Sequence, residues 1–71
     1  MEKKDLLEIA DMIKAKAEGY KNALEVYLNE IKASGKLATK DDTEKMQDLK
    51  AKLLTQLNRH TKIYKLIYEM N

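Results

Sequence analysis

The sequence contains no cysteine, proline, phenylalanine or tryptophan, and only two glycines and one histidine. Without cysteine there is no disulfide framework, no thiolate nucleophile and no zinc–cysteine site. A single histidine cannot build a histidine cluster around a metal, and two isolated glycines cannot form a phosphate-binding loop. The chain therefore predicts no catalytic residue, no cofactor and no metal site, and an enzyme is not expected.

Long apolar runs are also missing. No segment approaches the ~20 apolar residues needed to cross a bilayer, and Glu8 and Asp11 interrupt the region after Lys3 and Lys4 where a signal peptide would be apolar. We therefore expect a cytoplasmic protein with no membrane association. With 14 basic and 12 acidic residues the net charge is +2, far from the basic excess of a dedicated nucleic-acid binder.

Sheet-forming residues are scarce, because there is one valine and aromatic residues make up 6% of the chain. The sequence favours an all-α fold, and 71 residues allow one domain, residues 1–71. Below ~70–80 residues a single core rarely supplies more than ~3–5 kcal/mol. We therefore expect further stabilisation from self-association or from a partner.

Two long helices are predicted, at about residues 5–33 and about 40–69, joined by a loop at 34–39. Asp5 and Glu8 have the spacing of a capping box at the start of the first helix. Gly35 can take the left-handed conformation that ends a helix. Thr39, with Asp42 three residues later, is the predicted N-cap of the second helix, whose first turn also carries acidic residues that suit the helix dipole.

A heptad pattern runs through both helices, with apolar residues spaced alternately three and four apart. In an antiparallel pair, facing residues have a constant index sum. The seam of each helix consists of two sets of residues spaced seven apart. Paired antiparallel across the loop, one set gives index sums of 77 and the other gives 76 along its whole length, so the pattern predicts an antiparallel two-helix hairpin. The seam residues are Leu6, Ala10, Ile13, Ala17, Tyr20, Leu24, Tyr27 and Ile31, facing Met46, Leu49, Leu53, Gln56, His60, Ile63, Ile67 and Met70.

Gly19 leaves an alternative open. It interrupts the first helical segment, where it costs about 1 kcal/mol relative to alanine. A break there would give helices at 5–18 and 20–33 and a three-helix bundle. We expect the continuous helix, because Gly19 falls on the outer face of the hairpin.

The seam leaves many apolar residues unused, and such a surplus indicates helices in a larger bundle or an interface. Two occupants are predicted: a second copy of the chain, giving a homodimeric four-helix bundle, or one foreign protein that is regulated, inhibited or assembled by docking. The candidate partner-binding residues are Leu7, Val26, Leu28, Leu54, Leu57, Tyr64 and Tyr68.

Two polar features compete with this interpretation. His60 lies on the seam, one turn from Gln56 and one turn from Tyr64. A histidine in such a place can serve as a general base or a pH switch, but no carboxylate is spaced to orient it. We predict instead a polar layer in which Tyr20, Gln56 and His60 hydrogen-bond across the hairpin.

The last third of the chain carries a net charge of about +4, so an alternative function is a nucleic-acid-binding hairpin dimer that uses Lys52, Arg59, Lys62 and Lys65.

The chain is predicted to have two long helices, a short loop and polar residues in the seam. In this plan it is similar to the Rop-type RNA-modulating hairpin dimers. It is equally similar to small helical-hairpin secretion chaperones. No matched residue carries either resemblance, so no functional position is implied. The Lys-, Glu-, Ile- and Asn-rich composition resembles that of small proteins of low-GC bacteria and their phages.

Overall fold

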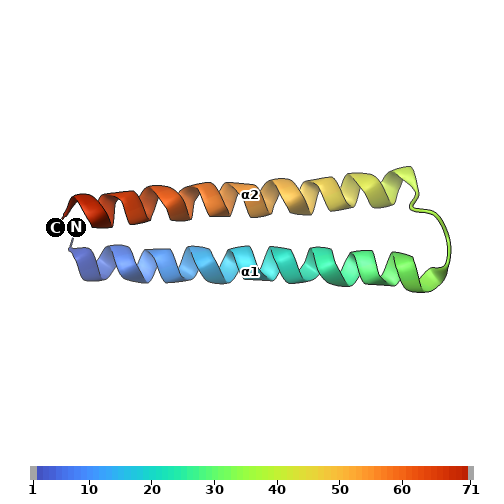
Figure 1. The fold of residues 1–71 in the computed structure, drawn as a ribbon, viewed down its shortest axis with the longest axis horizontal. Helices are drawn as coiled ribbons and strands as arrows, with labels where there is room; N and C mark the ends of the chain where they lie inside the picture. The colour runs from blue at the N-terminus through green and yellow to red at the C-terminus, as the bar shows by residue number, and fades with distance from the viewer. Residues whose placement is uncertain (1, 71) are drawn as a thin grey trace.

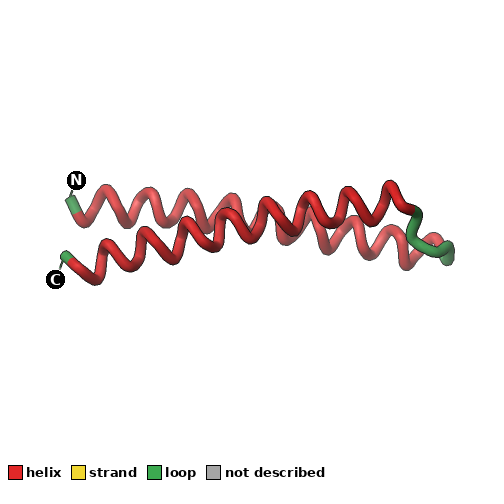
Figure 2. The backbone as a smooth tube through the Cα atoms, turned by 90° about the horizontal axis from the view of Figure 1, so that it is seen from above, coloured by secondary structure: helices red, strands yellow, loops and turns green. Residues whose placement is uncertain are grey.

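The computed structural model describes residues 2–70 and contains two antiparallel helices of nearly equal length. Helix α1 spans Lys3–Ser34 and helix α2 spans Lys40–Glu69. The helices lie side by side, so the start of α1 and the end of α2 lie at one end of the molecule and the loop forms the other (Figure 1). Viewed from above, they cross at a shallow angle near their middle (Figure 2). The predicted helical hairpin is confirmed.

The start of α1 differs from the prediction, which placed the N-cap at Asp5. The N-cap is three residues earlier, at Glu2, so the helix begins at Lys3 and Asp5 is the third helical residue. From that position the Asp5 carboxylate accepts a hydrogen bond from the backbone N–H of Glu2 at 3.3 Å. The prediction of Asp5 with Glu8 as the capping pair was wrong because an aspartate serves equally well at the third position of a capping box, and the earlier start adds helical hydrogen bonds.

The loop-side helix ends follow the predicted caps. Gly35 has φ 69° and its N–H donates to the Lys32 carbonyl at 3.2 Å, the left-handed ending that favours glycine. At the start of α2, the Asp42 N–H donates to Thr39 Oγ1 at 3.1 Å and the Thr39 N–H donates to Asp42 Oδ2 at 3.0 Å. This reciprocal pair is a capping box and confirms Thr39 as N-cap.

Gly19 does not break α1. It lies within the continuous helix Lys3–Ser34, with no other atom within 4 Å of where a Cβ would stand. The alternative of a three-helix bundle is therefore wrong. Because open space surrounds the position, the glycine has no packing role that the structure reveals.

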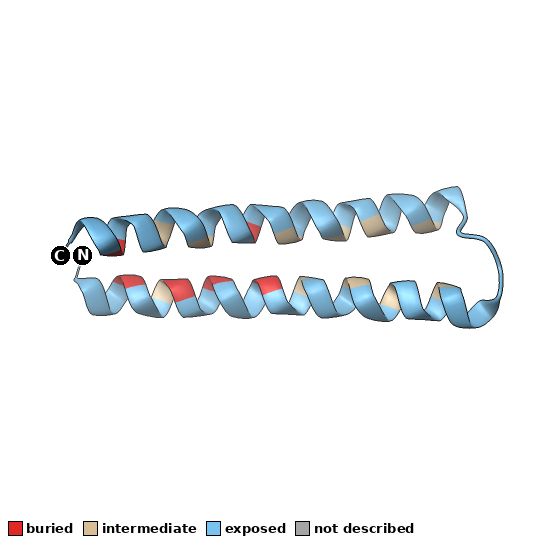
Figure 3. Cartoon of the chain, in the orientation of Figure 1, coloured by how far each residue is buried: buried red, intermediate tan, exposed pale blue. Residues whose placement is uncertain are grey.

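The buried core is the predicted seam. The buried residues are Leu6, Ala10, Ile13, Ala17, Gln56 and Ile67. The other predicted seam residues are half-buried except Met70, which is 46% exposed because α2 ends at Glu69. The buried residues all lie in the part of the hairpin farther from the loop (Figure 3). There the small Ala10 and Ala17 oppose larger residues, so the helices can interdigitate.

Candidate protein interface

A second set of regularly spaced side chains runs along α2 outside the buried seam. Leu54, Leu57, Thr61, Tyr64 and Tyr68 are separated by three, four, three and four residues, the same heptad spacing as the seam. We call these five residues the α2 stripe. At 3.6 residues per turn they lie about a quarter turn round the helix from the seam. The stripe therefore lies along one broad side of the hairpin.

The α2 stripe is open to solvent over its length. Leu54 is 52% exposed, Leu57 47%, Tyr64 37% and Tyr68 75%. None of its five residues is charged, and the Thr61 hydroxyl already donates to the Leu57 carbonyl of its own helix at 3.0 Å. The stripe thus presents a largely apolar surface to solvent, and exposed apolar patches of this kind are found at interaction sites.

A hollow of about 410 Å³ lies beside the stripe, between the two helices. Ala17, Leu53, Leu57 and His60 supply its apolar part. The small side chain of Ala17 leaves this space because a larger residue there would reach toward α2. Charged side chains complete the lining: Lys14, Glu18 and Lys21.

Helix α1 contributes two candidate partner-binding residues to the same broad side. Leu7, Lys14, Lys21 and Leu28 recur every seven residues and so share one side of α1. Since Lys14 and Lys21 line the hollow, Leu7 and Leu28, each 39% exposed, lie on the side that carries the α2 stripe. Six of the seven candidate residues therefore share one face.

Val26 does not join them. It is 56% exposed and lies two residues before Leu28, which places it roughly 160° farther round α1. Met12, 69% exposed, shares that outer side of α1. Scattered apolar residues on an outer helical surface are normal in soluble proteins.

The opposite groove of the hairpin has a shorter apolar patch near the open end. A hollow there is lined by Leu6, Ile9, Ile63, Leu66, Glu69 and Met70. Farther along the same groove, Lys16 and Arg59 flank Ile13 and Gln56. Charges therefore limit this patch to the last turns of the two helices, whereas the α2 stripe extends over four turns.

Most of the candidate nucleic-acid residues lie away from the stripe on α2. Lys52 and Arg59 are seven residues apart and share the side opposite the stripe, and Lys62 lies next to that side. Lys65 instead borders the stripe, since it lines one hollow with Thr61, Tyr64 and Tyr68. Lys52 is already paired with Asp48 at 3.0 Å. Tyr64 and Tyr68, the aromatic residues available for base stacking, belong to the stripe. The structure thus separates most of the basic side chains from the aromatic ones.

The predicted polar layer does not form as expected. Among the described residues no hydrogen bond joins Tyr20, Gln56 and His60, and the buried Gln56 Oε1 has no hydrogen-bond partner. The His60 ring instead packs against the Tyr64 ring, with centroids 4.6 Å apart. The prediction was wrong because seam spacing fixes which residues face one another but not whether their polar atoms reach hydrogen-bonding distance.

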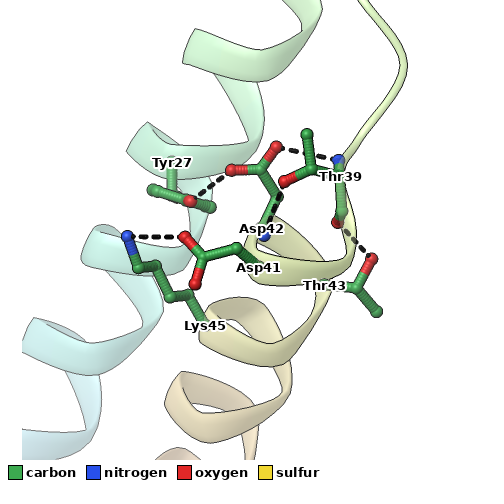
Figure 4. A network of polar contacts seen from close by, with 6 residues as sticks. All are labelled: Tyr27, Thr39, Asp41, Asp42, Thr43 and Lys45. Carbon is green, nitrogen blue, oxygen red and sulfur yellow. Dashed lines mark hydrogen bonds and ion pairs between the residues drawn. The ribbon is translucent and has the colours of Figure 1, made fainter.

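A polar cluster that the sequence analysis missed joins the helices near the loop (Figure 4). The Tyr27 hydroxyl of α1 donates to Asp42 Oδ1 of α2 at 2.5 Å. This bond, followed by that from the Thr39 backbone, holds the pKa of Asp42 below its ordinary value. The same hydrogen bond raises the pKa of Tyr27. On the seam of α2, Leu49 lies seven residues before Gln56, and Asp42 lies seven residues before Leu49. The heptad spacing therefore places Asp42 on the seam and could have indicated this contact.

Next to this cluster, Lys45 pairs with Asp41 at 3.0 Å, and the Asp41 carboxylate raises the pKa of Lys45. Both side chains are largely exposed, so the pair adds little to stability. Within residues 2–70 no three side chains of histidine, cysteine, aspartate or glutamate gather as a metal-binding group. Neither helix, over the same residues, has the length and apolar character to cross a membrane.

Comparison with protein-family models, with curated proteins and with solved structures found no match. The interpretation of this chain therefore depends on its own surface.

Proposed function

We propose that the chain is a small non-catalytic protein-protein interaction module. Its docking surface is the α2 stripe with Leu7 and Leu28 of α1, and it acts as a regulator, inhibitor or adaptor by binding. One observation carries the proposal: five heptad-spaced, uncharged residues of α2 lie exposed beside an apolar hollow. Helices that present such a stripe bind other helices laid along them.

The geometry of the stripe also supports the arrangement of the complex. Because the stripe lies about a quarter turn from the seam, helices docked on it form a second layer over the hairpin instead of extending the same layer. Two further helices in that layer would complete a four-helix bundle. This arrangement would bury most of the apolar residues that the hairpin leaves exposed.

Nucleic-acid binding through Lys52, Arg59, Lys62 and Lys65 is the competing function. It has less support, because Lys52 is ion-paired and the tyrosines that would stack on bases lie on the stripe. Salt separates the two functions. Four phosphate contacts would lose roughly a hundredfold in affinity between about 50 mM and about 200 mM salt through counterion release, whereas apolar docking would barely change.

A matched pair of variants tests the proposed surface. Leu57→Glu puts a charge in the centre of the stripe, and Val26→Glu puts the same charge on an equally exposed apolar residue elsewhere. In pull-downs with the tagged chain from cells that express it, a partner that uses the stripe is retained by the wild type and Val26→Glu at both salt concentrations and lost by Leu57→Glu. A partner lost equally with both variants, or released by salt, would contradict the proposal.

A further inference from the structure

We infer that the groove opposite the α2 stripe holds a phosphate site, formed by Lys16 of α1 and by Gln56 and Arg59 of α2. Its ligand is a phosphate dianion, either the free ion or the terminal phosphate group of a small molecule. The inference goes beyond the proposed docking function, because the site lies on the other side of the hairpin and shares no residue with the docking surface.

A small hollow in this groove brings the three residues together. It is lined by Ile9, Met12, Ile13, Lys16, Gln56 and Arg59. Its volume is about 130 Å³, and since a water takes up about 30 Å³ of the liquid, it has room for roughly four waters. Pockets for drug-sized ligands measure about 300–1,000 Å³. The hollow is therefore too small for such a ligand but can hold a phosphate group.

The amide of Gln56 is the buried part of the site. Only 8% of the residue is exposed, and its Oε1 has no hydrogen-bond partner. Buried polar atoms are rarely left without a partner, because the loss of hydration is not repaid. Since the side chain lines the hollow, a ligand there can reach the amide. A half turn about the last side-chain bond exchanges Oε1 and Nε2, so the amide can offer the ligand a donor or an acceptor.

The two cations of the site lack a counter-charge. Lys16 and Arg59 line one hollow from opposite helices, and charged residues that flank the seam of paired helices commonly face charges of opposite sign. Here both are basic. Among residues 2–70, neither takes part in an ion pair or in a side-chain hydrogen bond. An anion bound between them would replace their mutual repulsion by attraction.

No carboxylate of the described chain lines the hollow. In α2 there is no aspartate or glutamate from residue 49 to residue 68, and Asp48, just before this range, is paired with Lys52. In α1, Asp11 and Glu18 are seven residues apart and share a side, and Glu18 lines the hollow beside the stripe. The acidic residues of this part of α1 therefore face the other groove and do not compete with an anion.

Charge and geometry select a phosphate dianion. Two cations are balanced by a ligand with two negative charges, whereas a carboxylate balances only one. The Arg59 guanidinium can donate two parallel hydrogen bonds to two phosphate oxygens, which leaves the other oxygens for Lys16 and Gln56. Because both cations are exposed and must be ordered on binding, we expect a weak site with a Kd on the order of 1 mM.

Titration of the isotope-labelled full chain with inorganic phosphate, followed by NMR at constant ionic strength and pH, tests the site. The Gln56 side-chain amide and the Arg59 Nε–H signals should shift and saturate with a Kd on the order of 1 mM. Lys16→Gln and Arg59→Gln should each weaken binding roughly tenfold or more, because each removes a charge-assisted hydrogen bond. Lys21→Gln is the matched control: Lys21 belongs to the same helix but lines the other hollow, so the Kd should not change.

Gln56→Leu separates a built site from general attraction of anions to exposed charges. It keeps both cations and removes the amide, so phosphate should bind several-fold more weakly, with helicity checked by circular dichroism. Three outcomes would overturn the inference. They are shifts that rise without saturation, equal weakening by Lys16→Gln and Lys21→Gln, and unchanged binding by Gln56→Leu.

Two methyl esters identify the source of the phosphate. Methyl phosphate is a dianion, and if it binds as tightly as inorganic phosphate, the site takes terminal phosphate groups of small molecules. If it binds at least tenfold more weakly while inorganic phosphate binds as expected, the ligand is the free ion. Dimethyl phosphate carries a single charge, as each phosphate of a nucleic-acid backbone does, and should bind roughly tenfold more weakly or less. Equal binding of dimethyl phosphate would overturn the assignment to a dianion and favour nucleic acid.

Discussion

The two halves of the hairpin are held together in different ways. The open-end half, residues 3–19 of α1 and 55–69 of α2, contains all the buried residues of the described chain. In the loop-end half, residues 20–34 and 40–54, seam residues are half-buried, and the helices are joined by the Tyr27–Asp42 hydrogen bond and the caps at Gly35 and Thr39.

Side-chain size explains the difference. In the open-end half Ala10 and Ala17 leave room for Ile67 and His60, so the helices interdigitate. In the loop-end half Leu24 faces Leu53 and Tyr27 faces Leu49, and large residues opposite large ones remain partly exposed. Apolar packing thus stabilises the part of the hairpin where the chain does not hold the helices together. The loop-end half already has the loop to hold it.

The largest expected contrast is between Ile13→Ala and Leu24→Ala. Ile13 is 5% exposed, so its truncation should lower the free energy of unfolding by about 3 kcal/mol through lost burial and a cavity. The half-buried Leu24 should cost about half as much. Urea unfolding followed by circular dichroism, at one fixed protein concentration, measures both. Equal losses would mean that the halves do not differ in packing.

Gln56→Leu should sharpen the contrast by stabilising the open-end half. The buried Gln56 Oε1 has no partner, and replacing an unsatisfied polar group by an apolar one of similar size should raise the free energy of unfolding by about 1–2 kcal/mol. Gln47→Leu, at an exposed position of the same helix, is the control and should change stability by less than about 0.5 kcal/mol. A destabilised Gln56→Leu protein would show that the amide has a partner in solution.

The two glycines should respond in opposite directions to alanine. Gly19 lies in α1 with no neighbouring atom in the way, so Gly19→Ala should raise the melting temperature, by a stabilisation of about 1 kcal/mol. Gly35 has φ 69°, where a Cβ is strained, so Gly35→Ala should lower it by a similar amount. If Gly19→Ala were destabilising, the glycine would have to serve a contact outside the hairpin.

The smallest effect concerns pH. The pKa of Asp42 is lowered in the folded state, so its contribution is present above the unfolded value of ~3.9 and disappears as the pH falls through the folded value. Tyr27→Phe removes the main cause of the shift. The difference in urea midpoint between wild type and Tyr27→Phe should therefore be largest near neutral pH and shrink below about pH 4. Tyr20→Phe should show no such pH dependence.

Much of the fold could be predicted because its determinants are local. Heptad spacing fixes which side of each helix is buried, and Gly35 and Thr39 mark the loop by conformational preferences that need no partner. The N-terminus of α1 was predicted wrongly because Asp5 suits two positions of the same capping motif. The pattern thus indicated a capping box correctly, but the predicted position of that box along the chain was wrong by about one turn.

The polar side chains could not be predicted from spacing. The heptad placed Gln56 and Tyr20 on the seam but did not fix the reach of either side chain, and Gln56 Oε1 is left without a partner. Tyr27 meets Asp42 although its partner by index is Leu49, which lies seven residues, or about two turns, farther along α2. For the candidate interface, six of the seven predicted residues share a face. Val26 differs because the position of an apolar residue outside the seam does not by itself specify a side of the hairpin.

The position of the buried core also has a consequence for the order of folding. Tyr27 and Asp42 are 15 residues apart in the chain, whereas Ala10 and Ile67 come from nearly opposite ends of it. Closing a short loop costs less entropy than closing a long one. We therefore expect the turns near the loop to pair first and the open end to close last. If so, Ile13→Ala will accelerate unfolding while leaving the refolding rate nearly unchanged, and the best-packed end of the hairpin will set how long the protein stays folded.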